Sequence, residues 1–274
     1  MPMAELPEIS KITKQMNSKL TGKEILEITL LQNKSANVSG KNFCKRCKCA
    51  KILSVKNKGK WFWISLDNKE NILISLGMGG DLLYFKDSKI KSEKYQVRVN
   101  FADNTGFTLR FWWFGKFILC SDKELSSEPN TKDIGIDPYD KRFTIEYFKE
   151  ILKGKKTQIK AFLLNQKNIS AIGNMYMHDI LFKAKLHPKK KIQDMKEKDI
   201  LALYDSINNI FEFSQKKGAS WYEFDFLGKK GNYCREDFLV GYKEKKPCPI
   251  CSSEIQFIKT GSTSSYICPK CQKI

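Results

Sequence analysis

Two Cys-x-x-Cys pairs near the end of the sequence constrain the fold more than any other feature. The segment PCPICSSEIQFIKTGSTSSYICPKCQKI, residues 247–274, places sixteen residues between the two pairs. Thiolates at this spacing can converge tetrahedrally on one Zn²⁺, and the strand-like stretch between them predicts a β-hairpin. Because four protein ligands leave no open position for a reacting water, we predict a structural zinc and no organic cofactor. The predicted ligands are Cys248, Cys251, Cys268 and Cys271.

The 274-residue chain is strongly basic, with 49 lysines and arginines against 30 aspartates and glutamates. The net charge of +19 is spread along the chain and favours a polyanionic partner, with nucleic acid ahead of an anionic membrane surface. No apolar run approaches the ~18 residues of a membrane span, and the N-terminus lacks the apolar region of a secretory signal. We expect an intracellular, cytoplasmic and nucleoid-associated monomer without a membrane partner.

Three further cysteines lie close together in FCKRCKC, namely Cys44, Cys47 and Cys49. In a reducing compartment such thiols are metal ligands, oxidation sensors or ordinary buried thiols rather than disulfides. Since no fourth ligand lies near them in the sequence, we favour ordinary thiols. The only two histidines are His178 and His187, which argues against a histidine-based hydrolytic triad.

The periodicity of the apolar residues changes along the chain and predicts an α+β fold. An amphipathic helix over residues 9–20 precedes short β-branched and aromatic segments from Ile25 to Leu119, which predict an antiparallel β-sandwich or barrel of about eight strands. Four segments with helical periodicity follow a polar, proline-containing stretch. The predicted domains are an N-terminal β-sandwich catalytic domain at 1–122, a linker at 123–140, a helical DNA-binding domain at 141–240 and a zinc finger at 241–274.

The segment LLNQKNISAIGNMYMHDILFKAKLHP, residues 163–188, predicts two helices joined by a turn. The first helix is expected to end near Gln166, and a glycine turn at Gly173 is expected to start the second. The first backbone N–H groups of that helix, with the outward-facing amide of Asn174, would suit a phosphate group.

This segment resembles the helix-two-turn-helix signature of the formamidopyrimidine-DNA glycosylase and endonuclease VIII family. Four more stretches agree, in the family's order: AELPEI at 4–9, KGKWFWISL at 58–66, LGMGGDL at 76–82 and the terminal finger. The resemblance covers essentially the whole chain. It implies a protein that bends double-stranded DNA containing a damaged base or an abasic site and receives the flipped-out base between its two main domains.

The resemblance also implies DNA-binding roles for four residues. Lys60 and Asn174 match phosphate-contacting residues, Met78 matches the residue that fills the vacated space in the base stack, and Phe114 matches an aromatic wedge. Wedges of this kind are what an enzyme needs when it extrudes a base from a duplex. For Lys60 the alternative is a solvated surface lysine, and for most of the aromatic run at 111–114 we expect burial in a strand of the sandwich.

The chemistry implied by the resemblance uses the mature N-terminal amine, normally of proline, as the nucleophile. The amine attacks C1′ of the sugar to form a Schiff base, which permits β-elimination of the 3′ phosphate, and an adjacent glutamate transfers protons. Against the family pattern PELPEV, Ala4 occupies the proline position and Glu5 the glutamate position, while Pro2 lies two residues earlier. Two nucleophiles stay open: Pro2 after removal of Met1, or Ala4 if synthesis starts at Met3. The expected catalytic residues are Pro2, Ala4, Glu5 and Lys60.

Three positions depart from the family pattern. Asp179 stands where a glutamate is usual, Thr263 replaces an arginine of the finger, and Trp113 precedes the Phe-Gly pair where an arginine is common. We expect a base-excision repair enzyme, a bifunctional DNA glycosylase and abasic-site lyase. The alternatives are a non-catalytic or lyase-deficient binder of damaged DNA, and use of the scaffold on RNA or an unusual adduct. The choice of base is expected to depend on a loop within residues 214–233.

Overall fold

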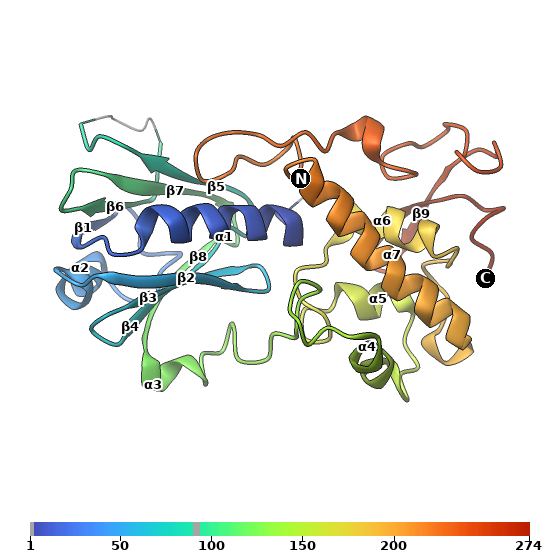
Figure 1. Cartoon of the computed structure of the whole chain (residues 1–274), viewed down its shortest axis with the longest axis horizontal. Coiled ribbons are helices and arrows are strands. Elements are labelled where there is room, and N and C mark those ends of the chain that lie inside the picture. Colours follow the sequence, from blue (N-terminus) through green and yellow to red (C-terminus); the bar gives the residue numbers. More distant parts are fainter. Residues whose placement is uncertain (1–2, 90–93) are drawn as a thin grey trace. The chain divides into compact units, whose positions relative to one another are not determined.

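The computed structural model describes residues 3–89 and 94–274. Its α+β architecture confirms the predicted fold class and is drawn in Figure 1. The chain packs into two compact units, one of Met1–Asp133 with Ala219–Gly231 and one of Ile134–Gly218 with Asn232–Ile274. These units are a division by packing, and the domain boundaries given above stay a prediction. No helix within the described ranges is long and apolar enough to cross a membrane.

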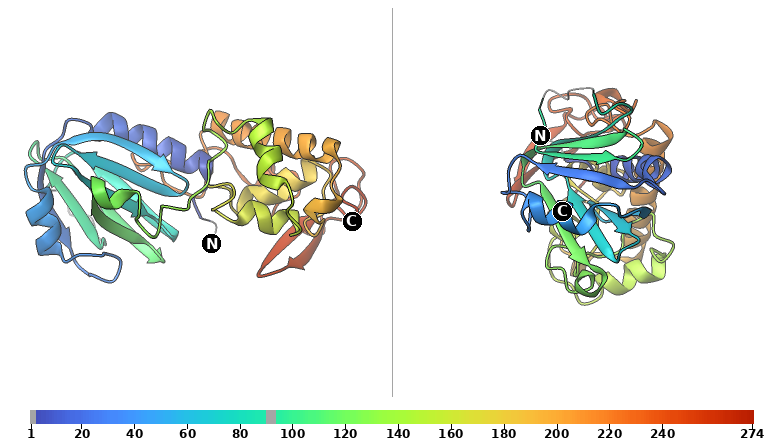
Figure 2. Two further views of the ribbon diagram at one scale, coloured as in Figure 1. Left: turned by 90° about the horizontal axis from the view of Figure 1, so that it is seen from below. Right: turned by 90° about the vertical axis from the view of Figure 1, so that its left-hand side faces the viewer.

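The N-terminal unit is a sandwich of two antiparallel four-stranded sheets, which Figure 2 shows from two further directions. One sheet has the order β1-β6-β7-β5 and the other the order β2-β3-β4-β8. Side chains at alternate positions of each strand point into the space between the sheets, which produces the alternating pattern seen in the sequence. The strands are β1 (Ile25–Leu30), β2 (Ile52–Lys58), β3 (Trp61–Leu66), β4 (Glu70–Ser75), β5 (Met78–Phe85), β6 (Val97–Phe101), β7 (Gly106–Trp113) and β8 (Lys116–Ser121).

Helix α1 (Leu6–Leu20) belongs to the same core as the two sheets. Its apolar residues Ile9, Ile12, Met16 and Leu20 recur at helical spacing and are all buried. The helix is therefore held by tertiary packing, and it begins three residues earlier than predicted. That earlier start makes Glu5 the N-cap residue and leaves Ala4 in the same buried core.

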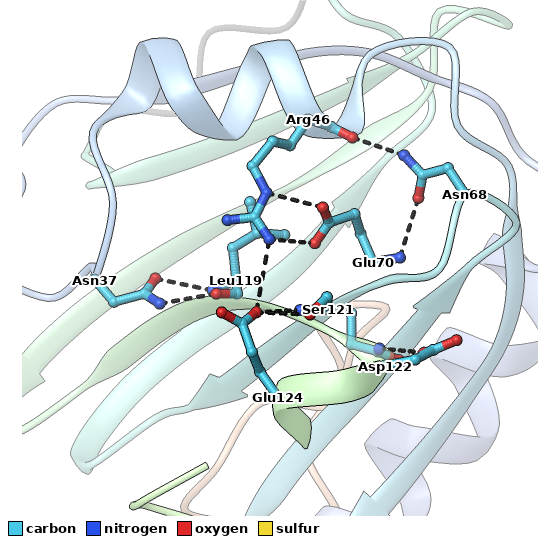
Figure 3. A network of polar contacts seen from close by, with 9 residues as sticks. Asn37, Arg46, Asn68, Glu70, Leu119, Ser121, Asp122 and Glu124 are labelled. Atoms are coloured by element: carbon cyan, nitrogen blue, oxygen red, sulfur yellow. Dashed lines mark hydrogen bonds and ion pairs between the residues drawn. The ribbon is translucent and has the colours of Figure 1, made fainter. Parts of the chain in front are cut away.

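Helix α2 (Gly40–Cys47) is an element that the sequence did not predict, and Figure 3 shows how it is attached. Arg46 donates two hydrogen bonds to the carboxylate of Glu70 on β4, at 2.8 and 2.5 Å. Glu124 of the short helix α3 (Asp122–Leu125) lies 3.9 Å from the same guanidinium group. Asn68 adds a bond of 2.7 Å to the carbonyl of Arg46. A bidentate ion pair of this kind fixes the orientation of the helix as well as its position.

The C-terminal unit contains the four predicted helices and the predicted hairpin. Its longest helix, α7, packs against α6, and the hairpin also contacts α6. Gly173 is the N-cap of α6, as the sequence predicted. The elements are α4 (Ile145–Leu152), α5 (Ile159–Leu164), α6 (Asn174–Lys183), the 3-10 turns η1 (Ile192–Asp194) and η2 (Arg235–Asp237), α7 (Glu197–Lys216), β9 (Gln256–Thr260) and β10 (Thr263–Ile267).

Candidate active site

Two buried glutamates define the start of α1. Glu5 is the N-cap residue, and its backbone N–H donates to the Oε2 atom of Glu8 at 3.0 Å. The side chain of Glu5 in turn accepts from the backbone of Glu8, which completes a capping box. Glu5 and Glu8 are 1% and 3% exposed, and the preceding Ala4 is 6% exposed. Burial and the capping box therefore fix the AELPEI segment, residues 4–9, within the N-terminal unit.

Lys60 lies at the tip of the hairpin that joins β2 and β3. Lys58 pairs with Trp61, so Gly59 and Lys60 form a two-residue turn, and Gly59 supplies the positive φ of +57° that such a turn requires. The side chain of Lys60 is half-buried, and burial lowers its pKa, an effect that the carboxylates of Glu5 and Glu8 partly offset. Lys60 therefore lies within electrostatic range of Glu5 and Glu8, and its side chain is half-buried rather than fully solvated.

The segment Ala219–Gly231 packs with the N-terminal unit although it follows α7 in the sequence. The backbone N–H of Ser220 donates to Oε1 of Glu8 at 2.9 Å. Asp225 binds Lys11 at 2.9 Å and Gln15 at 3.0 Å, both on α1. The backbone of Phe226 accepts from the N–H of Tyr84 on β5 at 2.8 Å. This segment lies within the loop that we expected to govern the choice of base, and it directly contacts a glutamate of the site.

Glu223 is a residue of this segment that the sequence analysis missed. Its Oε1 atom is buried and has no hydrogen-bond partner among the described residues. Burial and then the negative charges of Glu8 and Asp81 together raise the pKa of Glu223 to about 8, against an opposing effect of Lys230. Near neutral pH this carboxyl group therefore carries a proton that it can donate, whereas an ordinary glutamate only accepts hydrogen bonds.

Met78 and Phe114, the two residues expected to enter the base stack, lie at the ends of two neighbouring strands. Met78 begins β5 and pairs with Trp113 of β7. Gly77, at φ +64°, lets the two segments approach closely, because a Cβ atom there would lie 2.1 Å from the carbonyl oxygen of Trp113. Phe114 follows in the turn between β7 and β8 and is exposed.

The expectation that most of the aromatic run at 111–114 is buried is wrong. Only Phe111 faces the core, and the next three aromatic residues are exposed. The run lies at the end of β7, where the strand passes into the turn. Burial of a strand end depends on whether the facing sheet covers it, and the residue types alone do not determine that.

Asn174 is the first residue of α6 and belongs to the C-terminal unit. Its side chain is half-buried rather than facing outward, with Nδ2 3.5 Å from Nε2 of His178 one turn further along. Burial and then the positive charge of the nearby Lys160 together lower the pKa of His178 to about 3. The Oδ1 atom of Asn174 is buried and lacks a partner among the described residues.

Asp179 holds α6 to the following segment. Its carboxylate accepts from the backbone N–H groups of Leu239, Val240 and Gly241 at 2.7, 2.9 and 2.9 Å. Burial raises the pKa of this carboxyl group, and the three amide bonds oppose that shift. Asp179 is therefore a positioning residue for the polypeptide that leads into the finger.

The four predicted zinc ligands converge at the base of the β9–β10 hairpin. Their sulfur atoms all lie within 4.8 Å of one another, with Sγ–Sγ distances of 3.4 Å for Cys251–Cys268 and 3.9 Å for Cys248–Cys271. A tetrahedral zinc with bonds of ~2.3 Å requires sulfur atoms ~3.8 Å apart, so the four thiolates fit a structural Zn²⁺. The predicted cofactor is confirmed.

The cysteines of FCKRCKC show no such convergence. Cys47 is buried in the core, where burial raises the pKa of its thiol to about 12, while Cys49 is exposed. Within residues 3–89 and 94–274, the finger is the only group of three or more cysteine, histidine or acidic side chains placed to hold a metal. The interpretation of these three cysteines as ordinary thiols stays a prediction.

The structure therefore gathers Ala4, Glu5 and Lys60 of the predicted catalytic residues around the start of α1. Pro2 lies outside the described residues. Glu8 and Glu223 are residues of the site that the sequence analysis did not identify. The spacing of two glutamates in a capping box could have pointed to Glu8. Glu223 has no comparable sequence signal, because its place depends on how the loop folds back.

Comparison with known proteins matches all three parts of the chain to described families. Residues 3–114 match the formamidopyrimidine-DNA glycosylase N-terminal domain, and residues 134–224 match the formamidopyrimidine-DNA glycosylase H2TH domain. Residues 245–274 match the zinc finger found in FPG and IleRS.

Curated relatives match over their full length. A protein of Pelotomaculum thermopropionicum named formamidopyrimidine-DNA glycosylase is 31% identical over 281 residues, covering 99% of this chain and 100% of the relative. A protein of the same name from the Wolbachia of Brugia malayi is 31% identical over 273 residues, covering 98% and 100%.

Solved structures match the chain over nearly its full length. The complex of Lactococcus lactis Fpg with abasic-site DNA superposes with a TM-score of 0.89 at 26% identity, covering 98% of this chain and 100% of that one. Its complex with Fapy-dG-containing DNA gives a TM-score of 0.88 at the same identity and coverage.

Proposed function

Since the chain belongs to the formamidopyrimidine-DNA glycosylase family and is a base-excision DNA repair enzyme, we propose that it is bifunctional. It removes a damaged base from a flipped nucleotide in double-stranded DNA and then cleaves the strand at the abasic site. An N-terminal amine is the nucleophile in the first step, and the Schiff base that it forms permits the second. The observation that carries this proposal is the cluster of Glu5, Glu8 and Lys60 around the start of α1, directly after Ala4.

The amine suits this chemistry because it adds to C1′ of the sugar as the base departs. The resulting Schiff base withdraws electrons and permits β-elimination of the 3′ phosphate. An α-amino group has a reference pKa near ~8, so a useful fraction is neutral at physiological pH. Glu5 is the proposed proton-transfer group at the sugar. Its capping box with Glu8 holds it in place, which proton transfer requires.

Two residues are the proposed phosphate anchors. Lys60 carries its charge at the tip of a rigid two-residue turn, and Asn174 lies at the start of α6, where backbone N–H groups attract anions. Met78 fills the space that the flipped base leaves, and Phe114 is the wedge beside it. The exposure of Phe114 supports that role, because a wedge must reach the duplex.

The loop Ala219–Gly231 supports a role in choosing the base. Ser220 ties the loop to Glu8, and Glu223 presents a buried Oε1 atom that has no partner among the described residues. Which base is removed then depends on the hydrogen bonds that this loop can exchange with it, since an unpartnered buried group favours a ligand that satisfies it.

Borohydride trapping on duplex DNA with an abasic site, followed by mass mapping of the cross-linked peptide, tests the proposal. An adduct on Pro2 or Ala4 would support the amine mechanism and identify the nucleophile. Tight, salt-sensitive binding without any adduct would refute the lyase and favour the lyase-deficient binder. Release of a free damaged base in that case would retain a glycosylase that uses water.

A further inference from the structure

A groove of about 670 Å³ lies on the C-terminal unit. Helix α4, the loop that follows it, the turn η1 and the first turn of α7 line the groove, and none of the lining residues has a role in the proposed function. Its apolar residues are Leu152 and Ile192, which are buried, and Ile200, which is half-buried. The volume falls within the range of small-ligand sites, so the groove can take up an apolar side chain of a partner.

Two lysine runs adjoin this groove. Residues 153–156 read KGKK, and residues 189–191 read KKK. The chain around them pairs in a short antiparallel ladder, in which the N–H of Ile192 donates to the carbonyl of Thr157 at 3.0 Å. The first run lines the groove itself, and the second leads directly into Ile192. The fold therefore brings both runs to the groove although they are far apart in the sequence.

The lysines of both runs carry charge that the surrounding chain does not neutralise. Neither run contains an acidic residue. Among the described residues, Lys190 is the only member that forms an ion pair, with Asp199 at 3.4 Å. Lys153, Lys155 and Lys156 line the groove and are exposed. Their aliphatic stems can extend its apolar surface while the ammonium groups stay in water.

The acidic side chains that line the groove come from helices. Glu146 and Glu150 belong to α4, and Glu197 belongs to α7, where it pairs with Lys149 of α4 at 2.7 Å. The loop at 153–156 has only positive charge. The charge of the groove is therefore divided between its helices and its loop, which orients a charged ligand with its negative groups towards the loop.

We propose that this groove docks a partner protein through an apolar side chain flanked by aspartates or glutamates. The apolar side chain packs against Leu152, Ile192 and Ile200, and the carboxylates pair with the lysines of the loop at 153–156. Duplex DNA fits these observations less well, because its phosphates contact a basic surface without an apolar group to bury. Docking uses neither the amine nucleophile nor a flipped base, so it goes beyond the proposed function.

Fluorescence anisotropy with a labelled peptide of about ten residues, one phenylalanine flanked by aspartates in a glycine-serine background, tests the proposal. The full chain should bind it more tightly than matched peptides in which alanine replaces the phenylalanine or asparagine replaces the aspartates. Lys155→Ala/Lys156→Ala should weaken binding about 2- to 30-fold, since each exposed ion pair contributes modestly. Ile200→Ala should weaken it about 3- to 10-fold, because it removes part of the apolar surface. Lys41→Ala/Lys45→Ala makes the same change of charge at exposed positions of α2 and should leave binding unchanged.

The variants Lys155→Arg/Lys156→Arg and Ile200→Val keep the charge and the apolar surface and should bind like the wild type, which separates loss of contacts from loss of folding. Equal affinity for the phenylalanine and alanine peptides would overturn the proposal, because the groove would then attract charge alone. Unchanged peptide affinity in Lys155→Ala/Lys156→Ala would also overturn it. If that variant instead lowers the salt slope for undamaged duplex DNA by about 1.8, the value for two phosphates, the lysines serve nucleic acid and not a peptide.

Discussion

Replacing Glu223 with glutamine tests whether this carboxyl group is protonated in the folded protein. Glutamine keeps the shape and the neutral state of the protonated acid and removes only the ionisation. Burial and the charges of Glu8 and Asp81 raise the pKa of Glu223 from 4.5 to about 8. In the unfolded chain the group ionises near its ordinary value.

The sign of the pH dependence of stability depends on whether the folded or the unfolded state holds the proton of Glu223. Between pH 4.5 and about 8 the folded protein keeps a proton on Glu223 that the unfolded chain releases, so the free energy of unfolding falls as pH rises. At about 1.4 kcal/mol per pH unit the full interval gives an upper bound near ~5 kcal/mol. Since the side chain is half-buried and partly screened by solvent, we expect about 2–4 kcal/mol.

The Glu223→Gln variant should therefore match the wild type near pH 5 and exceed its stability by about 2–4 kcal/mol near pH 9. Urea unfolding followed by tryptophan fluorescence is the assay. All five tryptophans lie in the unit that contains Glu223, so the signal reports on that unit. Glu27→Gln makes the same chemical change at an exposed position of β1 and is the control. A difference between the Glu223→Gln variant and the wild type that is equal at pH 5 and pH 9 would refute the reasoning.

Three further changes have defined outcomes. Lys60→Ala should weaken binding to abasic-site duplex and lower the salt slope by about one, because one phosphate contact is lost, and an unchanged slope in a salt titration would contradict the assignment. Cys268→Ser should release the zinc and destabilise the finger, and metal analysis that finds the same zinc content would contradict the four-thiolate site. Lys160→Met should lower the free energy of unfolding by roughly 1–3 kcal/mol. The Lys160 ammonium group donates hydrogen bonds to the hairpin at Thr260, Ser264 and Ser265, and the variant loses them. An unchanged temperature of thermal unfolding would contradict that role.

The parts of the fold that the sequence predicted are those with a regular period or a fixed spacing. From Ile9 onwards the buried apolar residues of α1 recur every three or four positions, and the core residues of β6, which are Val97, Val99 and Phe101, alternate. Hydrophobic burial enforces both patterns locally, so they are visible without the structure. The zinc ligands are visible for a similar reason, because tetrahedral coordination restricts the spacing of each thiolate pair.

Helix α2 and the exposure of the aromatic residues at 112–114 could not be predicted in the same way. The segment that forms α2 is polar, buries only Phe43 and Cys47, and depends on the ion pair of Arg46 with Glu70. Residues Trp112, Trp113 and Phe114 have the composition of a buried strand, yet all three are exposed. Both features are decided by partners distant in the sequence, and local propensity does not contain that information.

The same argument explains why the loop Ala219–Gly231 was assigned to the helical domain by position. It follows α7 directly, and its sequence gives no sign that Ser220 bonds to Glu8, 212 residues away. The contact matters for function because Glu8 also accepts from the N–H of Glu5 through its other oxygen. One carboxylate thus joins the start of α1 to the loop proposed to choose the base.

A carboxylate has room for about four hydrogen bonds, so Glu8 can serve both partners at once. A change in the loop that withdraws Ser220 would leave Glu8 with a buried oxygen deprived of that partner and would loosen the cap that positions Glu5. We therefore expect the proposed base choice and the proposed proton transfer to be coupled through Glu8, so that mutations in this loop alter both the rate of excision and the choice of base.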